Sequence, residues 1–220
     1  MISFKNVSKR YPDGYVALNN IDLSVEPGEM VFLTGHSGAG KSTLLKLIAA
    51  IERPTSGTIT ISGQNIAQLK LGAIPYLRRK IGFIFQDHKL LFDRNVFDNV
   101  LLPLQIGSFE NHMMVSRVRA ALDKVGLLKK EKSMPIALSG GERQRLCIAR
   151  AVVHRPSILI ADEPTGNLDV DYARDIMAMF TSFNQVAGEN AVASTKNTTS
   201  GTVAARKGYR VVEIPYDFMR

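Results

Sequence analysis

One stretch of the sequence has the residue types and spacing of a phosphate-binding loop. It follows the pattern GxxxxGK[ST] and consists of Gly35, His36, Ser37, Gly38, Ala39, Gly40, Lys41 and Ser42, followed by Thr43. Glycines let backbone N–H groups turn inward around an anion, and a helix that starts at the loop directs its N-terminus at the same anion. Lys41 supplies a cation for the β- and γ-phosphates, and Ser42 offers a hydroxyl to Mg²⁺. The loop therefore predicts binding of a nucleoside triphosphate with Mg²⁺.

A second pattern is an apolar run that ends in two carboxylates. Residues 158–161 are Ile-Leu-Ile-Ala, and Asp162 and Glu163 follow them. A strand of this kind can place Asp162 near a metal ion and Glu163 beside an attacking water. Taken alone, the pattern is more typical of a strand followed by an acidic helix cap. Together with the phosphate loop, it favours the metal-binding and catalytic interpretation.

A third pattern, Leu138-Ser139-Gly140-Gly141-Glu142, leads directly into a predicted helix. A serine and two glycines at a helix start form another anion-binding N-terminus. One chain then has two phosphate-binding ends for one nucleotide site, which a head-to-tail dimer explains if each chain caps its partner's nucleotide. Ser139 and Glu142 also match a capping box, and the two interpretations are compatible.

The elements that must position these motifs alternate between strands and helices. Apolar runs predict strands, and spacings of three and four residues predict helices. Predicted strands cover 2–7, 17–25, 30–34, 58–62, 81–85, 157–161, 190–195 and 209–214, and predicted helices cover 41–51, 115–125, 142–153 and 169–183. This order predicts an α/β fold with a largely parallel sheet covered on both faces, and a helical insertion between about 87 and 150.

Composition excludes several classes of protein. The 220 residues include 28 Lys and Arg against 20 Asp and Glu, a net charge of +8, and 45% are hydrophobic, which excludes a disordered or collagen-like chain. The single cysteine, Cys147, excludes an internal disulfide framework, and we expect neither a signal peptide nor a membrane-spanning helix. The positive charge suits an acidic partner or a solvated surface. The longest basic cluster, residues 78–80, is too short for a nucleic-acid tract, so no nucleic-acid partner is expected.

The three motifs, in this order, resemble those of the ABC-type ATPases, the nucleotide-binding subunits of membrane transport systems. The resemblance implies a P-loop NTPase fold in a single domain over 1–220. Its core would comprise about 1–86 and 151–220, with an N-terminal antiparallel β subdomain and a helical subdomain over about 87–150. The expected cofactors are ATP and Mg²⁺, and the expected state is a homodimer that forms on ATP binding.

Other positions match the family in turn. Tyr11 lies where the family stacks an aromatic ring on adenine, and Gln86 matches a glutamine that touches Mg²⁺ and senses the membrane partner. Asp169, in Asn167-Leu168-Asp169, matches a loop that crosses the dimer interface. Each has a structural alternative: a turn aromatic, a polar strand end and a helix cap.

The resemblance also implies the role of each group. Glu163, Gln86 and Lys41 are the expected catalytic residues, and Ser42, Gln86 and Asp162 the expected metal ligands. Glu163 would orient or deprotonate the attacking water. Ser139, Gly140, Gly141 and Glu142 would act on the partner's nucleotide. Apolar residues 90–92 are candidates either for a partner-docking groove or for the core.

Within the family, the chain resembles the cell-division ATPases most. This resemblance rests on His36, the run Phe85-Gln86-Asp87-His88, residues 121–127 and residues 164–169. This implies an integral membrane partner, peripheral attachment at the cytoplasmic face of the inner membrane, contact with the division machinery and control of septal cell-wall hydrolysis. The alternatives are the ATPase of a lipoprotein-release or macrolide-type exporter, and a nucleotide-switched assembly scaffold with little turnover.

The match breaks near the C-terminus. Where the family has Thr-His-Asp, this chain has Thr195-Lys196-Asn197, and its four histidines, at 36, 88, 112 and 154, all precede Glu163. Three interpretations are open: Lys196 replaces the histidine as a cation, the site binds ATP but hydrolyses it slowly, or another region completes the site. The resemblance is expected to cover about 1–186 and to be poor from Ala187 onward.

Overall fold

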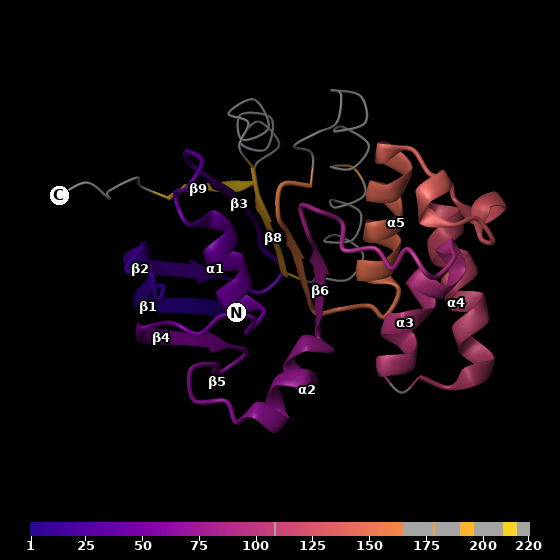
Figure 1. The fold of residues 1–220 in the computed structure, drawn as a ribbon. Coiled ribbons are helices and arrows are strands. Elements are labelled where there is room, and N and C mark those ends of the chain that lie inside the picture. Colours follow the sequence, from indigo (N-terminus) through magenta and orange to yellow (C-terminus); the bar gives the residue numbers. More distant parts are fainter. Residues whose placement is uncertain (108, 165–177, 179–189, 196–208, 215–220) are drawn as a thin grey trace.

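The computed structural model describes residues 1–107, 109–164, 178, 190–195 and 209–214. A central parallel sheet lies between an antiparallel sheet on one side and a group of helices on the other (Figure 1). Within the described residues, no helix combines the length and the apolar character needed to cross a membrane. The predicted helix over 169–183 lies outside the described residues.

The N-terminal part forms a four-stranded antiparallel sheet. Its strands are β1 (Ile2–Arg10), β2 (Val16–Val25), β4 (Ser56–Ile61) and β5 (Gln64–Asn65), in the order β2-β1-β4-β5. In β1 the side chains of Ile2 and Phe4 are buried and alternate with more exposed ones, as a sheet with one covered face requires. This confirms the predicted antiparallel β subdomain.

The second sheet is entirely parallel. Its strands are β3 (Met30–Thr34), β6 (Ile81–Ile84), β7 (Ile158–Ala161), β8 (Asn190–Ser194) and β9 (Arg210–Glu213), in the order β6-β7-β8-β3-β9. Every residue of β7 and β8 is buried, which explains their nearly continuous apolar sequences. Parallel pairing brings the carboxyl ends of these strands to one edge of the sheet, where the loop before helix α1 (Lys41–Ile48) also lies.

Helices make up the third part. They are α3 (Val96–Ile106), α4 (Asn111–Lys124) and α5 (Gly140–Val152), joined by the short helices η2 (Leu128–Lys130) and η3 (Pro135–Ala137). Two short helices, η1 (Leu71–Ala73) and α2 (Ile74–Arg78), precede β6. The sequence predicted the bounds of α5 closely. It predicted that α4 begins four residues later than it does, because apolar spacing marks the buried stripe of a helix and not its exposed first turn. It missed α3, whose mostly apolar sequence contains Pro103, a residue that seldom occurs inside a helix.

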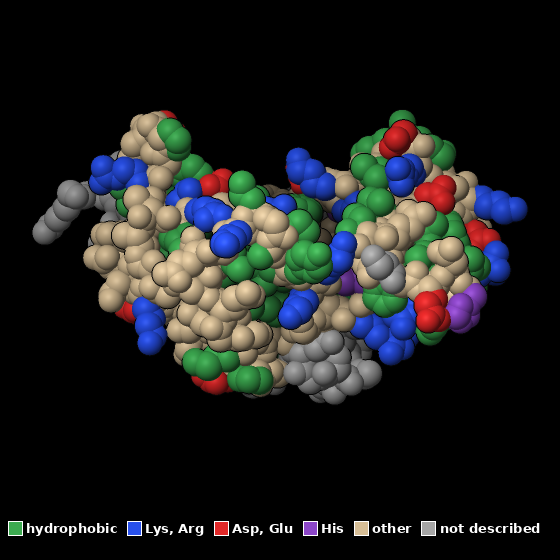
Figure 2. Space-filling view, turned by 90° about the horizontal axis from the view of Figure 1, so that it is seen from below, with side chains coloured by type: hydrophobic (Ala, Val, Ile, Leu, Met, Phe, Trp, Pro, Cys, Tyr) green, Lys and Arg blue, Asp and Glu red, His purple; other side chains and the backbone are tan. Residues whose placement is uncertain are grey.

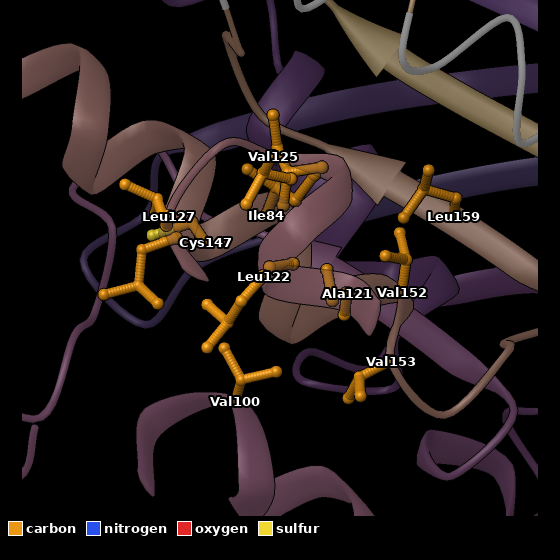
Figure 3. Close-up of a cluster of buried hydrophobic side chains, with 14 of the residues drawn as sticks. Ile84, Val100, Ala121, Leu122, Val125, Leu127, Cys147, Val152, Val153 and Leu159 are labelled. Atoms are coloured by element: carbon orange, nitrogen blue, oxygen red, sulfur yellow. The ribbon is translucent and has the colours of Figure 1, made fainter. Parts of the chain in front are cut away.

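Two separate cores cover the two faces of the parallel sheet. In β3, Met30 and Phe32 belong to the core on the helical side, whereas Val31 and Leu33 pack with α1 and the antiparallel sheet. Figure 3 shows the helical-side core, in which Leu122, Leu127 and Cys147 lie together. Leu90 is buried in this core, which confirms the core interpretation for that side chain, whereas Phe92 is 56% exposed and its docking role stays a prediction.

Strand β6 packs against α5 at a glycine. A Cβ atom placed on Gly82 would lie 2.2 Å from the carbonyl oxygen of Ala151, near the end of α5. Real Cβ atoms do not approach a carbonyl oxygen this closely, so the sheet and the helix can pack at this distance only because residue 82 has no side chain.

We therefore predict that Gly82→Ala lowers the free energy of unfolding by about 1–3 kcal/mol, because one methyl group forces the sheet and α5 apart. Gly72→Ala is the matched control, since a Cβ at Gly72 meets nothing within 4 Å. Chemical unfolding of both variants measures the difference. Equal stabilities of the two variants would contradict this account of the packing.

Candidate active site

The phosphate loop joins β3 to α1 and has a backbone that requires glycine. Gly35, Gly38 and Gly40 have φ values of 136°, 85° and 86°, a region that other residues rarely adopt. A Cβ on Gly40 would lie 2.2 Å from the carbonyl oxygen of Ala17, and one on Gly35 2.8 Å from that of Ile214. The loop is therefore held tightly against its neighbours. Gly40 is the N-cap of α1 and brings no side-chain cap, so the helix N-terminus suits an anion.

Lys41 places its ammonium group inside the loop. The side chain is 5% exposed, and Nζ donates hydrogen bonds to the carbonyl oxygens of Gly35 at 2.7 Å and His36 at 2.8 Å. A buried cation needs such partners. A phosphate entering the loop would meet this ammonium group, as the sequence motif predicts.

The two predicted carboxylates lie beside the loop. Ser42 Oγ donates to Asp162 Oδ1 at 2.9 Å, and Gln86 Nε2 donates to Glu163 Oε2 at 2.9 Å. The structure thus brings together four predicted residues from three separate segments of the chain. They adjoin a pocket of about 230 Å³ whose lining includes Gly38, Lys41, Ser42, Thr43, Gln86 and Glu163.

The same side chains fit a magnesium ion. Hydroxyl, carboxylate and amide oxygens are the hard ligands that Mg²⁺ prefers, and Ser42, Asp162 and Gln86 supply one of each kind. Among the described residues, no group of three or more His, Cys, Asp or Glu could hold a metal ion. A magnesium ion here would therefore take its remaining ligands from phosphate and water, as it commonly does in nucleotide sites.

Glu163 has an unusual backbone conformation. Its φ of 50° lies in the left-handed region, and its backbone N–H donates to Ser194 Oγ at 2.9 Å. A conformation of this kind in a residue other than glycine costs on the order of 1–3 kcal/mol and persists only where neighbouring contacts hold it. Such strain at a predicted catalytic residue supports a functional role for that residue.

Two tyrosines border the phosphate loop. The hydroxyls of Tyr11 and Thr43 are 3.3 Å apart, and the Tyr15 hydroxyl donates to the carbonyl oxygen of Gly38 at 2.9 Å. The two rings are 19° from parallel, with centroids 6.4 Å apart. Tyr15 lines the pocket and was missed by the sequence analysis, which singled out Tyr11 four residues before it.

The third motif forms the N-terminus of α5. Ser139 Oγ accepts from the backbone N–H of Glu142 at 3.2 Å, and Glu142 Oε2 accepts from that of Ser139 at 3.0 Å, which confirms the capping box. Lys130 donates to Glu142 Oε1 at 2.6 Å, and this hydrogen bond is the main cause that lowers the pKa of Glu142. These residues are not among those that line the pocket within this chain. Ser139 still has its own hydroxyl proton to donate.

Helix α5 also holds the loops that carry the predicted catalytic residues. Gln144 Nε2 donates to the carbonyl oxygen of Pro164 at 3.0 Å, next to Glu163. Arg150 donates to the carbonyl oxygens of His88 at 2.5 Å and Lys89 at 2.6 Å, two residues with φ values of 63° and 45°. The sequence analysis did not find these roles, because a glutamine or arginine within a helix pattern carries no signal of its distant partner.

Cys147 is a core residue of α5. It is fully buried, and burial is the main cause that raises the pKa of its thiol to about 12. Its Sγ donates to the carbonyl oxygen of His88 at 3.3 Å. The site involves no cysteine chemistry. Two other predicted positions, Asp169 and Lys196, lie outside the described residues.

A phosphate loop between a buried strand and a helix, with a carboxylate pair at the end of a neighbouring parallel strand, defines a P-loop nucleotide-binding fold. The chain matches the ABC transporter family over residues 18–166, more than half of its length. It is 53% identical over 214 residues to the cell division ATP-binding protein FtsE of Escherichia coli (strain K12), covering 97% of this chain and 95% of that protein. The chain belongs to the ABC transporter family, and this confirms the predicted class, an ABC-type ATP hydrolase.

Two further comparisons agree. The FtsE protein of Bacillus subtilis (strain 168) is 45% identical over 197 residues, covering 90% of this chain and 86% of that protein. The dimeric structure of the ATP-binding cassette MJ0796 in a post-hydrolysis state with ADP and Pi has a TM-score of 0.89 and 33% identity, and covers 97% of this chain and 94% of that chain. The predicted fold class is therefore confirmed.

One expectation about the extent of the resemblance was wrong. A match of 214 residues cannot fit within residues 1–186, so the similarity continues into the C-terminal part. The absence of the histidine after Thr195 suggested a wider divergence than exists. A change at a few positions does not measure the similarity of the segment around them.

Proposed function

We propose that this chain binds ATP with Mg²⁺ and hydrolyses it as one subunit of a membrane-associated complex in cell division. One observation carries the proposal. The Ser42–Asp162 and Gln86–Glu163 hydrogen bonds lie at the same sheet edge as Lys41, beside one pocket. Hydrolysis needs all three functions together: a cation for the phosphates, ligands for the metal and a carboxylate for water.

Each group has a distinct role in this proposal. The backbone of residues 35–43 and the α1 N-terminus bind the phosphates, and Lys41 neutralises charge on the β- and γ-phosphates. Ser42, Asp162 and Gln86 would hold Mg²⁺, which when bound would neutralise charge on the phosphate oxygens. Tyr11 stacks on the adenine ring.

Glu163 orients or deprotonates the attacking water. The amide nitrogen of Gln86 donates to its carboxylate at 2.9 Å, so the amide oxygen of Gln86 is left for the metal. One side chain thus joins the metal ligands to the group that handles water. A movement of the loop after β6 would change both at once, which is how a partner bound at that loop would control turnover.

The second phosphate-binding end acts across a homodimer. Ser139, Gly140 and Gly141 start α5 away from their own chain's pocket, so they serve a nucleotide only in a partner chain. Glu142 supports this role indirectly, since its carboxylate accepts from the Ser139 backbone and fixes the N-terminus. Asp169 is proposed to contribute across the same interface. The dimeric state of the related cassette MJ0796 supports this arrangement.

A groove between the parallel sheet and the helices is proposed as the docking site for the membrane partner. It encloses about 540 Å³ and is lined by apolar side chains that include Phe83, Phe85 and Ile106. Four cationic residues line it as well, Arg78, Arg79, Lys89 and Arg150, and no described residue that lines it carries a carboxylate. Figure 2 shows the molecule from below the view of Figure 1, with basic side chains among apolar ones in the middle of this face. Such a groove suits a short amphipathic segment with an acidic residue.

The partner we propose is FtsX, an integral membrane protein, so that the chain sits peripherally at the cytoplasmic face of the inner membrane and controls septal cell-wall hydrolysis. The similarity to the FtsE proteins supports this choice. The ATPase of a lipoprotein-release or macrolide-type exporter would use the same chemistry with another partner. A nucleotide-switched scaffold with little turnover is a further alternative, favoured by Lys196 in place of the histidine.

We predict that Glu163→Gln binds ATP as the parent does but loses at least about 100-fold in turnover, since the amide cannot accept the proton of the attacking water. Phosphate release and calorimetric titration with ATP measure the two properties on the same preparations. If both proteins bind ATP and neither hydrolyses it, alone or with the membrane partner, the scaffold alternative is favoured over the ATPase.

The groove is tested by charge reversal. We predict that Arg79→Glu lowers the recovery of FtsX in co-purification by roughly tenfold, because an added carboxylate repels an acidic docking segment. Lys5→Glu makes the same charge change on an exposed residue of β1, away from the groove, and is expected to keep the partner. Equal recovery of FtsX with both variants would contradict the proposal that the groove is the docking site. Recovery of an exporter subunit in place of FtsX would contradict the proposed partner.

A further inference from the structure

Ser194, the last residue of β8, lies between the two catalytic carboxylates. Its hydroxyl donates to Asp162 Oδ1 at 2.8 Å and accepts from the backbone N–H of Glu163 at 2.9 Å. The side chain is fully buried, with 0% exposure. Neither the phosphate loop, the carboxylate motif nor the α5 N-terminus includes this residue, and the sequence analysis assigned it no role.

The register of the sheet explains this position. Ala193 of β8 pairs with Ala161 of β7, so Ser194 is the neighbour of the first residue after β7, which is Asp162. A serine at this one position can reach both the Asp162 carboxylate and the next peptide N–H. A residue earlier or later on β8 would point to the opposite face of the sheet.

The contact to Asp162 fixes a metal ligand. Two hydroxyls, from Ser42 and Ser194, donate to the same oxygen, Oδ1, of a carboxylate that is 6% exposed. A buried carboxylate keeps one orientation only when its hydrogen-bond partners hold it. Ser42 belongs to the phosphate loop and is itself a proposed metal ligand. Ser194 therefore holds Asp162 from the sheet, independently of the loop.

The contact to Glu163 fixes its backbone. The φ of 50° at Glu163 is a strained backbone conformation. The backbone N–H of Glu163 donates to Ser194 Oγ and not to the backbone of a neighbouring strand. The same conformation directs the Glu163 carboxylate to Gln86, 2.9 Å away. One hydroxyl thus couples the orientation of the metal ligand to that of the residue that handles water.

We propose that Ser194 is a positioning residue of the hydrolytic site, which aligns Asp162 with the metal and Glu163 with the attacking water. The proposal rests on the proposed ATPase function. It gives the end of β8 a polar contribution to the site that does not depend on Lys196, the residue found where the family has its histidine.

The test compares Ser194→Ala with Ser157→Ala, which removes a serine hydroxyl from the opposite end of the sheet, where Oγ donates to the Lys80 carbonyl oxygen. For Ser194→Ala we expect turnover at saturating ATP to fall at least about tenfold, since hydrogen bonds to charged groups are among the stronger ones. We expect the KM for ATP to change by less than about threefold, because the phosphate loop remains intact. Ser157→Ala is expected to match the parent.

A second readout does not depend on turnover. Calorimetric titration with ATP at several Mg²⁺ concentrations measures how strongly the metal supports nucleotide binding. Ser194→Ala should need several-fold more Mg²⁺ than the parent to reach the same ATP affinity, whereas binding without Mg²⁺ should be equal. A purely structural role would lower both affinities together.

The outcomes separate the two proposals. A parent that neither hydrolyses ATP nor binds it more tightly with Mg²⁺ defeats the proposed function itself. A parent that behaves as proposed, with Ser194→Ala unchanged in turnover and in Mg²⁺ requirement, overturns the role of Ser194. If Ser194→Ala does not fold, Ser194→Cys keeps the size and a weak hydrogen-bonding group. The Mg²⁺ concentration that Ser194→Cys needs for a given ATP affinity should then be higher than that of the parent. A Mg²⁺ requirement equal to that of the parent would also overturn the proposal.

Discussion

Parallel pairing of β6, β7, β8 and β3 is the constraint on which the rest of the site depends. It brings the carboxyl ends of four strands to one edge, so that Gln86, Asp162, Ser194 and the phosphate loop become neighbours although they are up to 159 positions apart (194 minus 35). The fold maintains this edge with a separate core on each face of the sheet. A glycine at residue 82 lets α5 pack closely against the sheet. The chemistry at the edge is therefore a consequence of the strand order.

Polar groups at this edge satisfy one another in a connected network. Ser42 and Ser194 donate to Asp162, Gln86 donates to Glu163, and the Glu163 backbone donates to Ser194. At its buried members, Asp162 and Ser194, a lost bond would leave a buried polar group unpaired, and this holds these side chains in one arrangement. Helix α5 supports the same edge separately: its Arg150 donates to the carbonyl oxygens of His88 and Lys89 in the loop after β6 and also lines the groove proposed for the membrane partner. One side chain thus contacts both the groove and the loop that follows Gln86.

The sequence predicted those parts of the site whose chemistry is local. The phosphate loop, the carboxylate pair and the Ser139–Glu142 capping box are each complete within a few residues, and the structure places them as expected. Tyr15, Ser194 and Arg150 were missed because their roles come from contacts with distant segments, such as the Ser194–Asp162 bond across 32 positions. Helix α3 was missed because its mostly apolar sequence contains Pro103, which argues against a helix when only the sequence is known. Composition and spacing carry no signal of such contacts.

The central claim is that each hydrolytic site combines the phosphate loop of one chain with the Ser139 helix end of another. The most direct measurement mixes two inactive variants, Lys41→Ala and Ser139→Arg, and follows phosphate release. Each alone should be inactive, whereas a heterodimer has one intact site. Equal mixing should therefore restore about one quarter of the parent rate, since half of the dimers are mixed and one of their two sites is intact. No recovery in mixtures shown by two affinity tags to contain heterodimers would contradict the account.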